Sequence, residues 1–199
     1  MSNKKKIQKA PATKTQGMPG ESPWPKRLAW IGGVGLVVAL VLVVFLSQPE
    51  LRGVPDGTET QAVGDPAHVD GQLHEDGEVP AGGAHNAVWQ NCGFYADEVN
   101  SENAVHSLEH GAVWIAYDPA LGSSLADELR QYVSRNEKVL VSPVPGQSAP
   151  IIATAWGQQL ELDDPSDTRL GQFVNEFTGS SGAPEPGGRC NGGVGSPSF

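Results

Sequence analysis

Two histidines, His106 and His110, lie four residues apart in a segment that is predicted to form a short helix. Asn100 or Ser101 can cap this helix, and Gly111 follows it where a left-handed C-terminal cap is favoured. Residues at positions i and i+4 share one helix face, so both imidazoles could reach a single metal ion. Alternatively, one ring packs in the core with a satisfied hydrogen bond and the other faces solvent. The spacing alone leaves both interpretations open.

The same five residues read H-x-x-E-H, a pattern in which two histidines bind zinc and the glutamate, here Glu109, activates water. Peptidases of this type need a larger domain and a distal acidic ligand, for which Glu185, in a Pro/Gly-rich segment, is a poor candidate. We therefore expect a noncatalytic protein, in which Glu109 orients a histidine or pairs with a cation. A zinc hydrolase is kept as a minor alternative.

Three further histidines, His68, His74 and His85, lie before this segment in the sequence. His85 comes from a loop and could supply a third ligand to a site at His106 and His110. His68 has a weaker case because it belongs to a predicted linker, and His74, beside two acids, has the weakest. The only methionines are Met1 and Met18, so thioether ligands for Cu(I) are missing from the rest of the chain. We therefore expect Zn(II) or Cu(II), if a metal binds.

The chain has two cysteines, Cys92 and Cys190. If both face an oxidising compartment, a disulfide between them is the default expectation, and it would be structural. The rival is a zinc or copper site of Cys92, His106 and His110, which would leave Cys190 unpaired and oxidisable.

Residues 28–46 form an apolar run without charged side chains, which as a helix would span about 28 Å, close to the thickness of a bilayer's hydrocarbon core. The preceding residues 1–27 carry seven Lys and Arg and one acid. The positive-inside rule then places the N-terminus in the cytoplasm and the rest of the chain outside. A cleaved signal peptide is the alternative, but its apolar core is usually shorter, and no A-x-A site follows.

Most of the chain after residue 27 is strongly acidic, because the whole chain has a net charge of −10 although its N-terminal tail is basic. That charge disfavours nucleic acid as a partner. We expect a single-pass protein of the cell membrane with an acidic extracytoplasmic domain, whose partners are the lipid bilayer and, as an alternative function, a larger membrane complex.

The hydrophobic pattern predicts one small α+β domain with a mostly antiparallel sheet and about three helices. The expected order is helix 101–110, strand 112–117, helix 121–133, strands 139–142, 151–156 and 159–162, and a last helix that starts at Asp164 or Asp167. Along the whole chain we expect a basic tail at 1–27, a transmembrane helix at 28–46, a Pro/Gly/Asp-rich stalk at 47–77, a globular domain at 78–190 and a flexible tail at 191–199.

Two blocks, HNAVWQNCG at 85–93 and ENAVHSLEHGAVW at 102–114, resemble a known bacterial family. The likeness continues in Ser142-Pro143, ATAWG at 153–157, Pro184-Glu185-Pro186 and Cys190. Over about residues 65–193 the chain is similar to the domain-of-unknown-function family thirty-one-oh-five. The family pattern usually has Pro-Pro-x-x-Gly-Pro before His85, and this chain departs from it at 79–84.

The resemblance implies a membrane-anchored protein of the cell envelope, found largely in actinobacteria, without an established activity. It also implies a site, because several candidate ligands fall on positions that the family motif carries: His68, His85, Cys92, His106, Glu109, His110 and Cys190. Two hypotheses follow. The first is an extracytoplasmic domain that binds zinc or copper through His106, His110, His85 and His68, with Glu109 in support. The second is an accessory subunit of a respiratory or transport assembly with purely structural histidines.

Overall fold

The computed structural model describes residues 34–41, 53–135 and 137–198, and the chain divides into two units, Met1–Ser47 and Gln48–Phe199. In the first unit, residues 34–41 form a helix. The rest of the predicted span at 28–46, and the basic tail before it, lie outside the described residues. Within the described part of the chain, no helix combines the length and hydrophobicity that a membrane crossing requires. The membrane topology stays a prediction.

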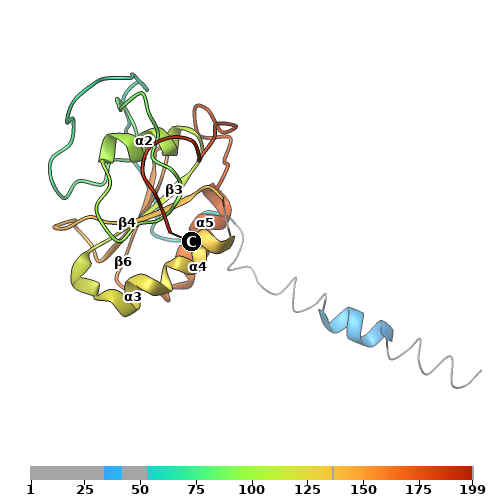
Figure 1. Cartoon of the computed structure of the whole chain (residues 1–199). Helices are drawn as coiled ribbons and strands as arrows, with labels where there is room; N and C mark the ends of the chain where they lie inside the picture. The colour runs from blue at the N-terminus through green and yellow to red at the C-terminus, as the bar shows by residue number, and fades with distance from the viewer. Residues whose placement is uncertain (1–33, 42–52, 136, 199) are drawn as a thin grey trace, which may run out of the picture. The chain divides into compact units, whose positions relative to one another are not determined.

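The second unit has the expected α+β class and contains one six-stranded sheet in the order β1-β6-β5-β3-β4-β2 (Figure 1). The strands are Glu59–Thr60 (β1), Gly93–Phe94 (β2), Val113–Tyr117 (β3), Val139–Pro143 (β4), Ile151–Ala155 (β5) and Gln158–Leu162 (β6). β3, β5, β6 and β1 pair antiparallel, whereas β2, β4 and β3 pair in parallel. The sheet is therefore mixed rather than mostly antiparallel. A long helical connection between β3 and β4 returns the chain to the same end of the sheet, as parallel pairing requires.

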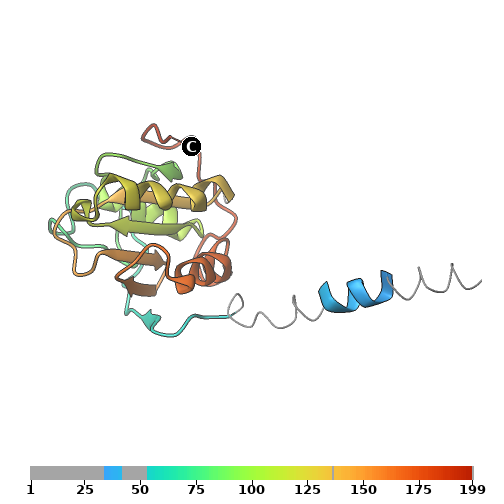
Figure 2. The ribbon, with the colours of Figure 1, turned by 90° about the horizontal axis from the view of Figure 1, so that it is seen from below.

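Four helices are described in this unit, against about three expected: Ser101–Glu109 (α2), Ser123–Glu128 (α3), Arg130–Arg135 (α4) and Thr168–Phe177 (α5), with a short 3₁₀ turn at Pro119–Leu121. The additional helix arises because the predicted helix 121–133 is divided. At Leu129 the backbone N–H donates to the carbonyl of Ala126, three residues back, which interrupts the α-helical hydrogen-bond ladder. Figure 2 shows α3 and α4, in yellow, following each other almost end to end.

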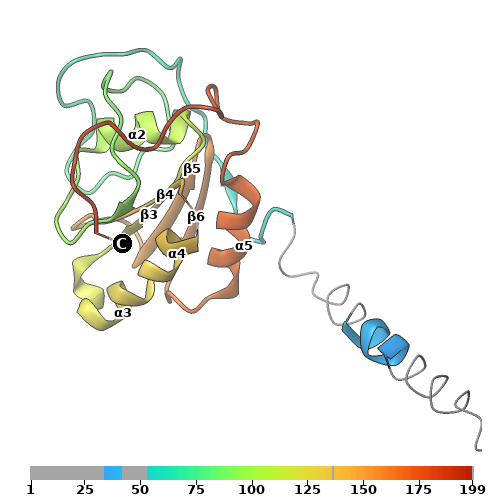
Figure 3. The ribbon, with the colours of Figure 1, turned by 45° about the vertical axis from the view of Figure 1, so that its right-hand side comes forward.

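The sheet has one core on each face, because successive residues of a strand point to opposite sides. Val113 and Ile115 of β3 pack in the core that includes side chains from α3, α4 and α5. Trp114 and Ala116 pack in the other core, which includes Leu108 of α2. All of β3 is buried, as its continuous apolar sequence predicts. Figure 3 shows α2 apart from α4 and α5.

The segments expected as stalk and flexible tail both contact this unit. In the first, β1 pairs with β6, and residue His68 forms a parallel β-bridge with His85. In the second, Val194 forms a bridge with Gln90 and Ser198 with Phe94. The red C-terminal segment can be followed past α2 in Figure 3. Both segments are therefore hydrogen-bonded to the domain along part of their length.

Candidate metal centre

Helix α2 carries three of the candidate ligands, His106, Glu109 and His110. The Asn100 side chain caps the helix by accepting a hydrogen bond from the N–H of Asn103, and His110 is its C-cap residue. These features confirm the helix predicted from the sequence. The three candidate side chains are nearly fully buried, since loops from both ends of the unit cover the helix on the side away from the sheet.

His85 and His68 come from two segments that are hydrogen-bonded to each other. The N–H of His85 donates to the carbonyl of Ala67 at 2.9 Å, and the N–H of Val69 donates to the carbonyl of His85 at 2.8 Å. Glu102 of α2 accepts hydrogen bonds from the N–H groups of the nearby residues 73 and 74. Burial acts to raise the pKa of Glu102, but these backbone hydrogen bonds lower it below its usual range. The ionised carboxylate thus ties the segment that carries His68 to α2.

Three of the rings are oriented by backbone carbonyls. Nδ1 of His85 lies 2.7 Å from the oxygen of Gly83, Nδ1 of His106 lies 2.7 Å from that of Asn86, and Nδ1 of His110 lies 2.6 Å from that of Arg189. A carbonyl can only accept, so each Nδ1 carries the proton and donates it. In a neutral ring this leaves a lone pair on Nε2, the arrangement that is usual in histidines that ligate a metal.

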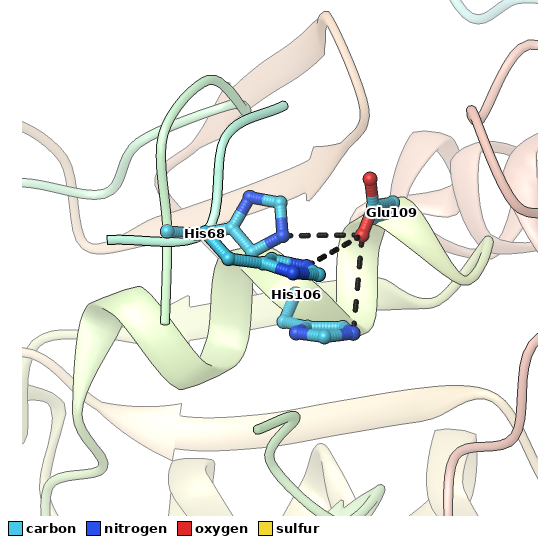
Figure 4. A group of neighbouring side chains, drawn as sticks. His68, His106 and Glu109 are labelled. Carbon is cyan, nitrogen blue, oxygen red and sulfur yellow. Dashed lines mark hydrogen bonds and ion pairs between the residues drawn. The ribbon is translucent and has the colours of Figure 1, made fainter. Parts of the chain in front are cut away.

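Three Nε2 atoms, those of His68, His85 and His106, lie near the carboxylate of Glu109. Its Oε2 atom lies 3.1 Å from Nε2 of His85, 3.7 Å from Nε2 of His68 and 3.8 Å from Nε2 of His106. Figure 4 shows three dashed lines that meet at one oxygen of Glu109. One ligand atom from each of these four residues lies within 4.8 Å of all the others, so this group could hold a metal ion.

His106 and His110 form the closest pair of rings, with 3.1 Å between their Nε2 atoms. Both Nδ1 atoms donate to carbonyls, so in the neutral rings two lone pairs face each other without a proton between them. A cation removes that repulsion.

The environment of His106 favours the neutral form of its ring. Burial lowers the pKa of His106 below its ordinary value, and the neighbouring rings of His110 and His85 lower it further, against the opposing effects of its carbonyl partner and Glu109. Of the four residues in the group that contains Glu109, only His68 is substantially exposed, with half of its side chain accessible. The group is therefore closed on the side of α2 and open on the side of His68.

A second group shares Glu109 and includes His110 and Glu185. The Oε2 atom of Glu185 lies 3.7 Å from Nε2 of His110. From the sequence, Glu185 is expected to be a poor ligand because of its Pro/Gly-rich surroundings, and Glu109 is expected to have only a supporting role, whereas the structure places both in this second group. The sequence does contain a signal for Glu185: it lies five residues before Cys190, and the expected disulfide of Cys190 would hold that segment against the domain. No sequence signal could have found the carbonyls that orient the rings.

The two cysteines are paired, as expected, and Cys92 is thereby unavailable as a thiolate ligand. Cys92 and Cys190 form a disulfide that links positions 98 residues apart, and the N–H of Cys92 donates to the carbonyl of Cys190 at 2.8 Å. His74 lies outside both groups, and its Nδ1 lies 3.8 Å from Oε2 of Glu78. The disulfide instead anchors the C-terminal segment, which supplies Glu185 and the carbonyl of Arg189.

Two further contacts hold that segment beside α2. The N–H of Glu185 donates to the carbonyl of Glu109 at 2.9 Å. The ammonium of Lys138 donates to the carbonyls of His110 and Pro186, both at 2.7 Å, and its partial burial lowers the pKa of Lys138. The end of α2 and the C-terminal segment thus share one cation as a hydrogen-bond donor.

Close packing at Gly188 leads to a first prediction. A Cβ atom at Gly188 would overlap the imidazole ring of His110, whereas one at Gly187 would meet nothing within 4 Å. We expect Gly188→Ala to displace His110 from the carbonyl of Arg189 and to destabilise the domain by about 1–3 kcal/mol, as overpacking usually does. Urea unfolding of the full-length protein measures this effect. Gly187→Ala is the matched control, and equal unfolding midpoints for the two variants would contradict the described position of His110.

Comparison with known proteins agrees with the resemblance noted in the sequence. Residues 68–192 match the family described as "Protein of unknown function (DUF3105)". This range contains all the candidate ligands and both cysteines. None of the curated proteins and none of the solved structures matches the chain.

Proposed function

The chain belongs to the DUF3105 family, whose description assigns no function, and from its site we propose that it binds a divalent transition-metal ion. The proposed ligands are Nε2 of His68, His85 and His106 and a carboxylate oxygen of Glu109. The ion's role here is to be bound and held, without catalysis. The reader can follow three of these side chains by their labels in Figure 4.

The observation that carries this proposal is the orientation of the buried rings. His85 and His106 direct protonated Nδ1 atoms at backbone carbonyls, so that in the neutral rings the lone pairs of Nε2 lie on the side of a buried carboxylate. A purely structural cluster would be expected to place a hydrogen-bond donor opposite each acceptor. Nitrogen lone pairs and carboxylate oxygens that face one another are all acceptors, and a cation bound between them would satisfy them.

The donor set favours Zn²⁺ or Cu²⁺. Three imidazole nitrogens and one carboxylate suit both ions, whereas Cu(I) prefers thiolate or thioether ligands. Both cysteines are in a disulfide, and the methionines of the chain are Met1 and Met18. Zn²⁺ and Cu²⁺ are therefore the ions to test first.

The proposed setting is the outer side of a cell membrane. The apolar segment 28–46, the basic residues before it and the disulfide support a single-pass protein with its N-terminus in the cytoplasm and this domain outside. The lipid bilayer is then its first partner. A role in a larger membrane complex is the alternative, and it gains weight if no metal binds.

Hydrolysis is less well supported than binding, although H-x-x-E-H is present. In that mechanism the glutamate acts as a base on a metal-bound water and is not a ligand. Here Oε2 of Glu109 lies 3.1 Å from Nε2 of His85, inside the group of candidate ligands. A carboxylate in that place is suited to coordinating the ion.

The test is metal content and affinity of the full-length protein, purified in mild detergent without a polyhistidine tag. We expect bound zinc or copper in the natural protein. We expect His68→Gln, at the exposed edge of the group, to weaken zinc affinity by more than about 100-fold, since the loss of even an outer hydrogen bond costs about 10–100-fold at metal sites. His74→Gln is the matched control, because His74 lies outside both groups.

Two outcomes would refute this proposal. One is a natural protein that neither contains nor takes up zinc or copper. The other is an affinity that His68→Gln and His74→Gln reduce equally, because the metal would then be bound nonspecifically. Either result would favour the accessory-subunit alternative and purification in search of partners.

A further inference from the structure

We propose that a second divalent transition-metal ion binds next to the first, held by Glu109, His110 and Glu185, with the carboxylate of Glu109 bridging the two ions. This inference rests on the proposed function and extends it from one ion to a pair. The three ligand atoms of this second group lie within 4.8 Å of one another.

Nε2 of His110 faces other candidate ligand atoms. Its Nδ1 donates to the carbonyl of Arg189 at 2.6 Å, so the lone pair of the neutral ring is on Nε2. That Nε2 faces Oε2 of Glu185 at 3.7 Å and Nε2 of His106 at 3.1 Å. A carboxylate and a second unprotonated nitrogen are both acceptors. His110 is only 5% exposed, and in its neutral form Nε2 is an acceptor that faces two other acceptors, an arrangement that a cation would satisfy.

The number of candidate ligands also favours a second ion. Three histidines and Glu109 complete a four-coordinate first site without His110, and four ligands is the usual number for Zn²⁺ held by a protein. His110 and Glu185 then remain for another ion. Glu109 has two carboxylate oxygens, so it can offer one to each site. Pairs of metal ions with shared ligands commonly lie about 3.5–4 Å apart.

The backbone of Glu185 is held in place, although its side chain is exposed. Its N–H donates to the carbonyl of Glu109, and the disulfide fixes Cys190 five residues further along. The nearby cation Lys138 donates to the carbonyls of His110 and Pro186. The backbone that carries Glu185 is therefore not a free loop.

The two sites differ in exposure. The second has three protein ligands, and the side chain of Glu185 is 65% exposed. Solvent would supply its remaining ligands, as at metal sites with an open position. The second ion is therefore the exchangeable one, and it should bind more weakly than the first.

The experiment is a copper titration of the full-length protein in mild detergent, with bound copper counted after gel filtration and unpaired spins counted by electron paramagnetic resonance. We expect two equivalents of Cu²⁺ in the natural protein and fewer detected spins than copper atoms, because a carboxylate bridge couples the two ions magnetically. Glu185→Gln should bind one equivalent and show one full spin. Glu128→Gln, an exposed acid of α3, is the matched control and should behave as the natural protein.

The outcomes separate this inference from the proposed function. Failure of all proteins to bind copper overturns both. One equivalent in the natural protein, whether or not Glu185→Gln changes it, overturns the second site and leaves the proposed function standing. Two equivalents with a full spin for each copper overturn the bridge, since the ions would then be far apart. Because the spin count is made on the natural protein, this last result does not depend on how any variant folds.

Discussion

Replacing His106 with alanine is expected to abolish tight metal binding and, with it, the thermal stabilisation that zinc gives to the full-length protein. His106 contributes to the first group through Nε2, and the same atom lies 3.1 Å from Nε2 of His110. Its loss removes a ligand from one proposed ion and disturbs a ligand of the other.

The expected size of the zinc-dependent rise in Tm follows from the linkage between metal binding and folding. Free zinc at 100 times its dissociation constant stabilises the folded state by about 2.7 kcal/mol. For a chain of this length, 1 kcal/mol corresponds to a shift in Tm of about 2–4 °C. Zinc should therefore raise the Tm of the natural protein by roughly 5–11 °C, and that of His106→Ala by almost nothing. Calorimetry or circular dichroism with and without zinc measures both values.

A control separates lost binding from general destabilisation. His106→Ala also leaves the carbonyl of Asn86 without its partner, which costs about 1–3 kcal/mol even without metal. Val105→Ala removes the fully buried side chain next to it and should lower the Tm by itself. In Val105→Ala, however, the zinc-dependent rise should persist. A similar zinc-dependent rise in His106→Ala would show that His106 is not a ligand.

The double substitution Cys92→Ala/Cys190→Ala is expected to destabilise the domain by about 2–5 kcal/mol. The disulfide closes a loop with a sequence separation of 98 residues, and the chain-entropy model gives a constraint of close to 5 kcal/mol for a loop of that size. Such a loss is a large part of the stability of a typical domain.

The disulfide also affects the site, because it holds the segment that supplies Glu185 and the carbonyl of Arg189 to His110. We expect the double variant to lose the more weakly bound ion before the tightly bound one. Urea unfolding measures the stability, and copper counting measures the second effect. The natural protein treated with a reductant should resemble the double variant. An unchanged urea midpoint in both would contradict a stabilising role for this bond.

Local features of the fold could be predicted from the sequence because they depend on neighbouring residues. Asn100 and Gly111 predict the ends of α2, and the structure confirms both. The apolar run before Gly157 and the alternation after it predict the hairpin of β5 and β6, which is also present. The parallel pairing of β3 with β4 was not predicted, since it depends on where a helical connection returns the chain.

The sequence by itself determined the ligand types and one spacing: His106 and His110 are four residues apart, so a single helix brings their rings together. It also determined the only possible cysteine pair. Tertiary structure alone decided which residues meet at Glu109, because His68, His85 and Glu185 come from loops that follow no periodic pattern. It also decided which nitrogen of each ring is free, because that depends on carbonyls of residues such as Gly83 and Arg189, and any residue type can provide a carbonyl.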